Sequence, residues 1–153
     1  MPTRRGLLLL ALLPAALAPA AGTAQTPPAS QSPTGLWETI DDHTGKARGV
    51  VRVFEYQGRL YGDIVRVLDP DKAGAVCAKC TDDRKGKPVQ GLQIIRGLQP
   101  DGDAWSGGTI LDPETGTTYR CSMHLADGGR KLVVRGYVGI SLLGRSQTWI
   151  RAG

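Results

Sequence analysis

The sequence has little of two features that catalytic and nucleic-acid-binding sites commonly use: histidine and clustered positive charge. Its two histidines are His43 and His124. Neither has an acid or a nucleophile in register with it, which argues against general-base catalysis. The lysines and arginines are scattered singly, without the interleaved aromatic residues of a nucleic-acid groove. We therefore expect no nucleic-acid partner.

The sequence also lacks an apolar run long enough for a membrane span. An apolar run from Leu7 to Leu17 follows Arg4 and Arg5, and small residues ending at Ala24 come after it. This order is typical of a secretory signal, and the run is too short to cross a bilayer as a helix. We expect cleavage after Ala24 and a periplasmic protein. The two arginines leave both the Sec and the twin-arginine export routes open.

The remaining chain predicts one short linker and one domain. Residues 1–24 form the predicted signal peptide, and residues 25–33, rich in Pro, Ser, Thr and Gln, form a predicted disordered linker. Residues 34–153 form a single predicted domain. Its pattern is clearest in residues 117–125, where Tyr119, Cys121 and Met123 alternate with polar residues. Such alternation is typical of a strand with one buried face.

The domain shows no helical period and reads as all-β. Tight turns join most of the predicted strands, which makes neighbours antiparallel. An antiparallel meander exposes two edges unless it closes, so we predict an eight-stranded up-and-down barrel. A two-sheet sandwich is the alternative, favoured if the long polar loop at 68–91 lets strands switch sheets. The predicted strands are 35–39, 49–56, 59–67, 92–98, 104–111, 117–125, 131–137 and 145–151.

The first predicted strand resembles the opening of a lipocalin barrel. Gly35-Leu36-Trp37 matches the Gly-x-Trp motif of that family. In lipocalins the Trp closes one end of the barrel and an Arg of the last strand packs across it. The resemblance implies that Arg151 or Arg145 packs on Trp37.

A second resemblance covers nearly all of the predicted domain. The chain is similar to a bacterial exported family catalogued as domain of unknown function 2147. That resemblance implies a lipocalin-like barrel and a periplasmic location, but no activity. It rests on Gly-Leu-Trp-Glu-Thr-Ile-Asp-Asp at 35–42, Leu-Asp-Pro-Asp-Lys at 68–72, Cys-Ala-Lys-Cys-Thr-Asp-Asp-Arg-Lys-Gly at 77–86, Gly-Gly-x-Ile-Leu-Asp-Pro-Glu-x-Gly at 107–116, and Arg-Gly-Tyr-Val-Gly-Ile-Ser-Leu-Leu-Gly-Arg-Ser-Gln-Thr-Trp at 135–149.

The three cysteines fit a disulfide better than a redox or metal site. An exported chain favours disulfides. The family resemblance implies a Cys77–Cys80 pair within the long loop, and pairing of either residue with Cys121 stays open. A Cys-x-x-Cys redox site belongs at a helix N-terminus, which is not predicted here. A metal site needs a second pair of ligands, which Cys121 and His124 do not provide on one strand face. We expect no metal and no cofactor.

The function favoured by the predicted fold is non-enzymatic binding of a small apolar or amphipathic molecule in the barrel mouth. The long loop and the apolar segment 137–143 would frame the entrance. Two alternatives remain: an envelope protein-interaction module with a filled barrel, and an enzyme that uses the Cys77/Cys80 loop. The candidate ligand-binding residues are Trp37, Trp105, Tyr119, Tyr137, Trp149 and Arg151.

Overall fold

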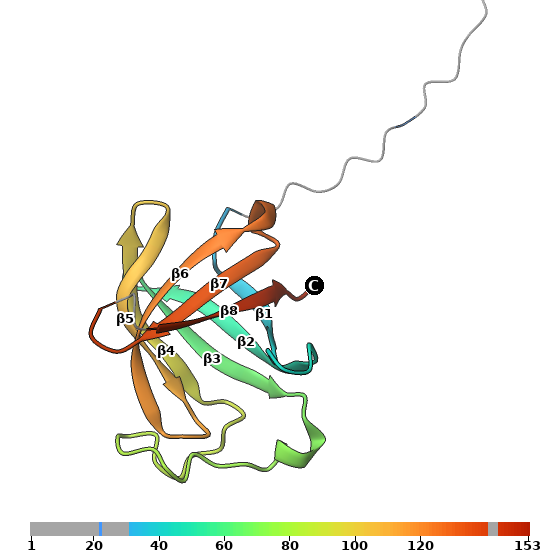
Figure 1. Ribbon diagram of the computed structural model, residues 1–153, viewed down its shortest axis with the longest axis vertical. Helices are drawn as coiled ribbons and strands as arrows, with labels where there is room; N and C mark the ends of the chain where they lie inside the picture. Colours follow the sequence, from blue (N-terminus) through green and yellow to red (C-terminus); the bar gives the residue numbers. More distant parts are fainter. Residues whose placement is uncertain (1–21, 23–30, 141–143) are drawn as a thin grey trace, which may run out of the picture.

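The computed structural model describes Gly22, residues 31–140 and residues 144–153. The predicted signal peptide, apart from Gly22, and residues 25–30 of the predicted linker lie outside the described residues. The described chain forms a closed antiparallel barrel of eight strands, in sequence order (Figure 1). The strands are β1 Gly35–Ile40, β2 Ala47–Tyr56, β3 Arg59–Val67, β4 Gln93–Asp101, β5 Ala104–Asp112, β6 Thr117–Ala126, β7 Lys131–Tyr137 and β8 Gly144–Arg151.

The strand pairing confirms the predicted barrel and excludes the two-sheet sandwich. Each strand pairs with its neighbours in sequence, and β1 closes the ring against β8. That closing seam is short, with Trp37 opposite Arg151 and Glu38 opposite Ile150. β4 is longer than predicted because Pro100 continues the strand opposite Trp105, and the chain reverses only at Gly102, with φ at 60°.

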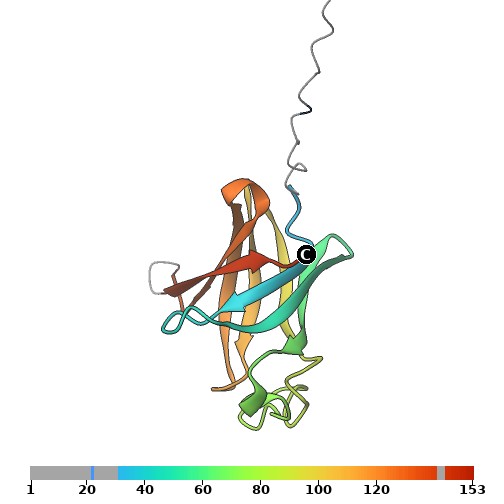
Figure 2. The ribbon, with the colours of Figure 1, turned by 90° about the vertical axis from the view of Figure 1, so that its right-hand side faces the viewer.

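The strand order gives the barrel two unlike ends. The tight turns β2–β3, β4–β5 and β6–β7 lie at the same end as the start of β1 and the end of β8. The longer connections, including residues 68–92 between β3 and β4, lie at the opposite end. Figure 2 shows this long loop at one end and residues 31–34, which lead into β1, at the other. We call the end with the three tight turns the closed end and the end with the long loop the open end.

Trp37 and Arg151 seal the closed end. Trp37 is fully buried, and its Nε1 donates to the Pro33 carbonyl oxygen at 2.8 Å. The Arg151 guanidinium carbon lies 4.2 Å from the Trp37 ring centroid. The same guanidinium donates to the carbonyl oxygens of Ser32, Thr34 and Gly129. Of the two predicted arginines, Arg151 therefore packs on Trp37.

Arg84 anchors the long loop to the starts of β4 and β6, which lie at the open end. This loop contains a short 3₁₀ helix, η1 Pro70–Lys72. The Arg84 side chain is only 3% exposed and donates to Asp82, to the Gln93 carbonyl oxygen and to Thr118 Oγ1. The hydrogen bonds from Arg84 lower the pKa of Asp82 to about 2. A loop held in this way can serve as a fixed part of the barrel rim.

Candidate functional site

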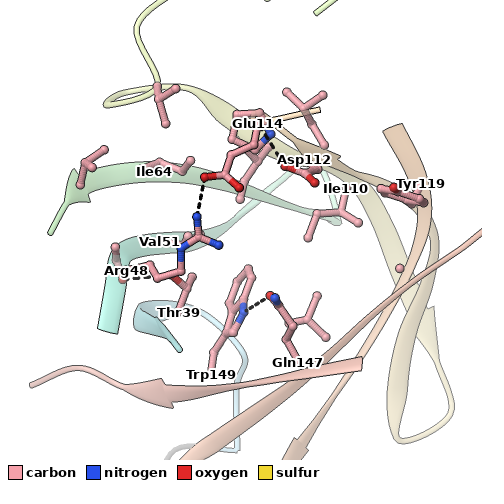
Figure 3. Close-up of a pocket in the computed structure, with 18 of the residues that line it drawn as sticks. Thr39, Arg48, Val51, Ile64, Ile110, Asp112, Glu114, Tyr119, Gln147 and Trp149 are labelled. Carbon is pink, nitrogen blue, oxygen red and sulfur yellow. Dashed lines mark hydrogen bonds and ion pairs between the residues drawn. The ribbon is translucent and has the colours of Figure 1, made fainter. Parts of the chain in front are cut away.

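The open end of the barrel holds a cavity of about 1000 Å³. Its walls include Val51 of β2, Ile64 of β3, Ile110 of β5 and Val134 of β7, so side chains from all around the barrel contribute (Figure 3). These apolar side chains face inward because alternate residues of a strand point to opposite faces of the sheet. The interior is therefore hollow toward the open end and packed toward the closed end.

Trp149 forms the floor of the cavity. It is 2% exposed, packs into the buried core and also lines the cavity. Its Nε1 donates to the Gln147 Oε1 at 3.3 Å, since residues two apart on β8 share one face. This bond satisfies a buried indole N–H that would otherwise lack a partner, and it orients the Gln147 amide within the cavity (Figure 3).

Charged side chains meet across the cavity mouth. Arg48 Nη2 lies 2.6 Å from Glu114 Oε1, and Lys72 Nζ pairs with the same oxygen. Arg48 belongs to β2, Lys72 to η1, and Glu114 to the turn between β5 and β6. Strands β3 and β4 separate β2 from β5 around the barrel, so the Arg48–Glu114 pair spans the opening (Figure 3).

The mouth is bordered by the long loop and by the start of the β7–β8 connection. Val76, Ala78 and Val138 line the cavity there. The apolar segment 137–143 was predicted to frame the entrance, and two of its described residues, Val138 and Ile140, are 64% and 61% exposed there. The pairing of β7 with β8 ends at Tyr137 and Gly144, so Val138, Gly139 and Ile140 lie beyond the ladder. Residues 141–143 lie outside the described part.

Half of the predicted ligand-binding residues line this cavity. Tyr119, Tyr137 and Trp149 do so. The cavity lining does not include Trp37, Trp105 or Arg151. Trp37 and Arg151 seal the closed end, and Trp105 packs against the core near the start of β5. We selected these residues mainly by their aromatic type, without using the predicted strand order to place each of them at one end of the barrel.

The charged residues at the mouth were missed for a related reason. Arg48 and Glu114 are 66 residues apart in sequence. The only sequence signal for these two residues is their position at the ends of predicted strands. In an up-and-down barrel those strand ends lie at the same end of the barrel. Using the predicted strand polarity, rather than residue type, would have selected them.

The cysteines fall into two separate environments. Cys77 and Cys80 form a disulfide within the long loop, with their Cα atoms 5.4 Å apart, and both are buried. Cys121 is free and buried. It lies two residues from Tyr119, which lines the cavity, and therefore on the inner face of β6. Within the described residues, no group of three or more His, Cys, Asp or Glu side chains is placed to hold a metal ion.

We expect the folded protein to resist thiol reagents. Burial raises the pKa of the Cys121 thiol to about 12. The thiol therefore stays protonated at a pH of about 8.5, where an ordinary cysteine is half ionised. Titration with a coloured disulfide reagent should find no reactive thiol in the native protein. In denaturant it should find one per chain before reduction and three after it. Three thiols without reduction would rule out the Cys77–Cys80 bond.

Comparison with known proteins agrees with this architecture. A structure described as "Protein HP1028 from the human pathogen Helicobacter pylori belongs to the lipocalin family" matches with a TM-score of 0.68 and 19% identity, over 78% of this chain and 82% of that one. At that identity the likeness shows the fold alone. No curated protein matches the chain. No helix of the described residues is long and apolar enough to cross a membrane.

The family comparison covers the whole barrel. The model of a family described as "Uncharacterized protein conserved in bacteria (DUF2147)" matches residues 35–151. These residues run from the first residue of β1 to the last residue of β8. The resemblance noted from the sequence is therefore confirmed, and the chain belongs to the DUF2147 family of uncharacterized bacterial proteins, with a lipocalin-like barrel.

Proposed function

We propose that this protein is exported to the periplasm and binds a small amphipathic molecule in the barrel cavity, without catalysing a reaction. The observation that carries the proposal is the cavity of about 1000 Å³, with an apolar wall and a charged mouth. Cavities that bind small molecules are typically apolar clefts of about 300–1000 Å³ with a few placed polar groups. The location rests on the N-terminal sequence pattern.

The two alternative functions have less support. An interaction module with a filled barrel would leave no interior space, whereas the cavity extends from the rim to Trp149. An enzyme using the Cys77/Cys80 loop would need an accessible thiolate. Both cysteines are at most 1% exposed and are joined to each other. Ligand binding is therefore the function that the geometry favours.

A cavity-filling substitution tests the proposal. Ile64→Trp places a large ring in the cavity, and Val65→Trp, the matched control, places it on the outer face, where Val65 is 38% exposed. An uncharged fluorescent naphthylamine should bind the wild-type protein and Val65→Trp alike. We expect Ile64→Trp to bind it about tenfold more weakly or worse, since the ring excludes roughly the volume of a ligand's apolar part.

Two measurements accompany this titration. Circular dichroism should show that both variants keep the β spectrum of the wild type. Native mass spectra of protein purified gently from a periplasmic fraction would reveal a bound natural ligand as an adduct lost on denaturation. Equal probe affinity in Ile64→Trp and Val65→Trp, or no binding of any apolar probe to the wild type, would refute binding in the cavity.

A further inference from the structure

We propose that the cavity selects single-chain amphiphiles with a carboxylate head, and that this head displaces Glu114 from Arg48 and Lys72. The inference rests on the proposed function and adds to it the chemical class of the ligand. In this arrangement the apolar tail lies along the cavity wall. Glu114 acts as an internal anion that occupies the head-group position while no ligand is bound.

Two cations share one carboxylate at the mouth of the cavity. Arg48 and Lys72 both contact Glu114 Oε1 at the rim of the cavity. Both cations and the glutamate line the cavity. A carboxylate on a ligand has the same charge and geometry as the Glu114 side chain. It can accept from the same two donors, and ligand binding then leaves neither cation without a partner.

Arg48 keeps a neighbouring carboxylate when Glu114 leaves. Arg48 Nη1 also lies 3.9 Å from Asp41 Oδ2. Asp41 is itself fixed, because its Oδ1 accepts from the backbone N–H groups of His43 and Thr44. A second carboxylate therefore stays beside the guanidinium when Glu114 leaves. A site whose donors are already positioned loses less conformational entropy on binding.

Glu114 is weakly held at the mouth and easily exchanged. Its side chain is 45% exposed, and it lies on a four-residue turn between β5 and β6. Ion pairs this exposed contribute little individually. A ligand head tethered by a tail already in the cavity has a high effective concentration at the rim. The ligand carboxylate is therefore favoured over the Glu114 carboxylate for binding to Arg48 and Lys72.

The other charges lining the mouth favour an anionic head over a cationic one. Arg145 pairs with Asp42, and Asp112 Oδ1 accepts from the Glu114 backbone N–H. Asp69 Oδ1 accepts from the Asp71 backbone N–H at the start of η1. Lys79 also lines the cavity and makes no ion pair with any residue that the structure describes. Asp69 and Asp112 form no ion pair either, but each accepts a backbone N–H, so of these three lining charges the one without a hydrogen-bond partner among the described residues is a cation.

The test compares three ligands with one tail and different heads. Dodecanoate, dodecanol and dodecylammonium are titrated against the wild-type protein below their micelle concentrations, by displacement of the uncharged naphthylamine. The affinity for dodecanol measures the contribution of the apolar tail without a charged head. We expect dodecanoate to bind about tenfold more tightly than dodecanol, the gain of charge-assisted bonds to partly exposed cations. Dodecylammonium should bind no more tightly than dodecanol.

Variants then assign the head-group position, with the dodecanoate-to-dodecanol affinity ratio as the readout. Glu114→Gln removes the internal competitor and should raise that ratio about threefold. Arg48→Gln combined with Lys72→Gln should bring it close to one. Glu55→Gln, an exposed change near the closed-end terminus of β2, is the matched charge control and should leave the ratio as in the wild type.

The outcomes separate this inference from the proposed function. Equal affinities for all three ligands, or a ratio unchanged in Glu114→Gln and in the double variant, would overturn the head-group assignment while leaving cavity binding intact. A preference for dodecylammonium would overturn it as well. If none of the three ligands displaces the probe from the wild type, or if the probe itself does not bind, the proposed function fails first.

Discussion

Replacing Trp37 with alanine is expected to lower the free energy of unfolding by about 3–5 kcal/mol, the usual cost of deleting a fully buried large aromatic side chain. Trp37 is 0% exposed and lies in the seam where β1 meets β8. The substitution removes the ring on which Arg151 packs and the donor to the Pro33 carbonyl oxygen. Urea denaturation followed by circular dichroism measures the loss.

Leu36→Ala is the matched control for this substitution. Leu36 is the adjacent residue of β1 but points outward and is 42% exposed. Its truncation should change the free energy of unfolding by about 0.5 kcal/mol or less, as for ordinary surface positions. A loss of similar size in Leu36→Ala and Trp37→Ala would mean that the closed end is not sealed by the tryptophan as the structure indicates.

The second large effect is expected at Gly116, where the β5–β6 turn touches the long loop. Gly116 has φ at 73°, and a Cβ atom there would overlap the Lys79 carbonyl group and lie 2.9 Å from the Cys80 nitrogen. Gly116→Ala therefore combines left-handed strain of about 1–2 kcal/mol with overpacking of about 1–3 kcal/mol. We expect a loss of about 3 kcal/mol in the free energy of unfolding, again measured with urea.

Gly58→Ala separates the two causes of that loss. Gly58 also has φ at 73°, but no atom lies within 4 Å of its would-be Cβ. Its substitution carries the backbone strain alone, so it should cost about 1–2 kcal/mol. Because Gly116 contacts a loop that lines the cavity, Gly116→Ala should also weaken binding of the apolar probe, and Gly58→Ala should not. Equal effects of both variants on stability and binding would contradict a close packing of loop and turn.

The barrel was predictable because its local signals agree with one another. Alternation placed Cys121 and Met123 on the buried face of β6, where the structure has them. The glycine pair at 107–108 in β5 is a sequence signal of a bulge or a close backbone approach. The β5–β6 register shifts between Trp105 and Gly108, and a Cβ on Gly108 would lie 2.7 Å from the Leu98 nitrogen. The alternation and the glycine pair can both be recognised within a few consecutive residues of the sequence.

The site was less predictable because it is built from residues distant in sequence. Whether the barrel interior is filled depends on how side chains of facing strands pack together. The sequence of a single strand does not show this packing. In the sequence Arg84 is one of several charged residues in a polar loop. In the structure it is buried and donates to the Gln93 carbonyl oxygen at the start of β4. Glu114 reads as a turn residue, and only the ring of strands places it opposite Arg48.

The short seam between β1 and β8 has a consequence for how the molecule folds. All other ladders join strands that follow one another in sequence, so most can form as local hairpins with a small loop-closure entropy. Joining β1 to β8 instead brings together the two distant ends of the barrel, which makes it the least local step and the most costly in chain entropy. Trp37 and Arg151 meet at that junction, so the contact that seals one end of the barrel also favours closure of the ring.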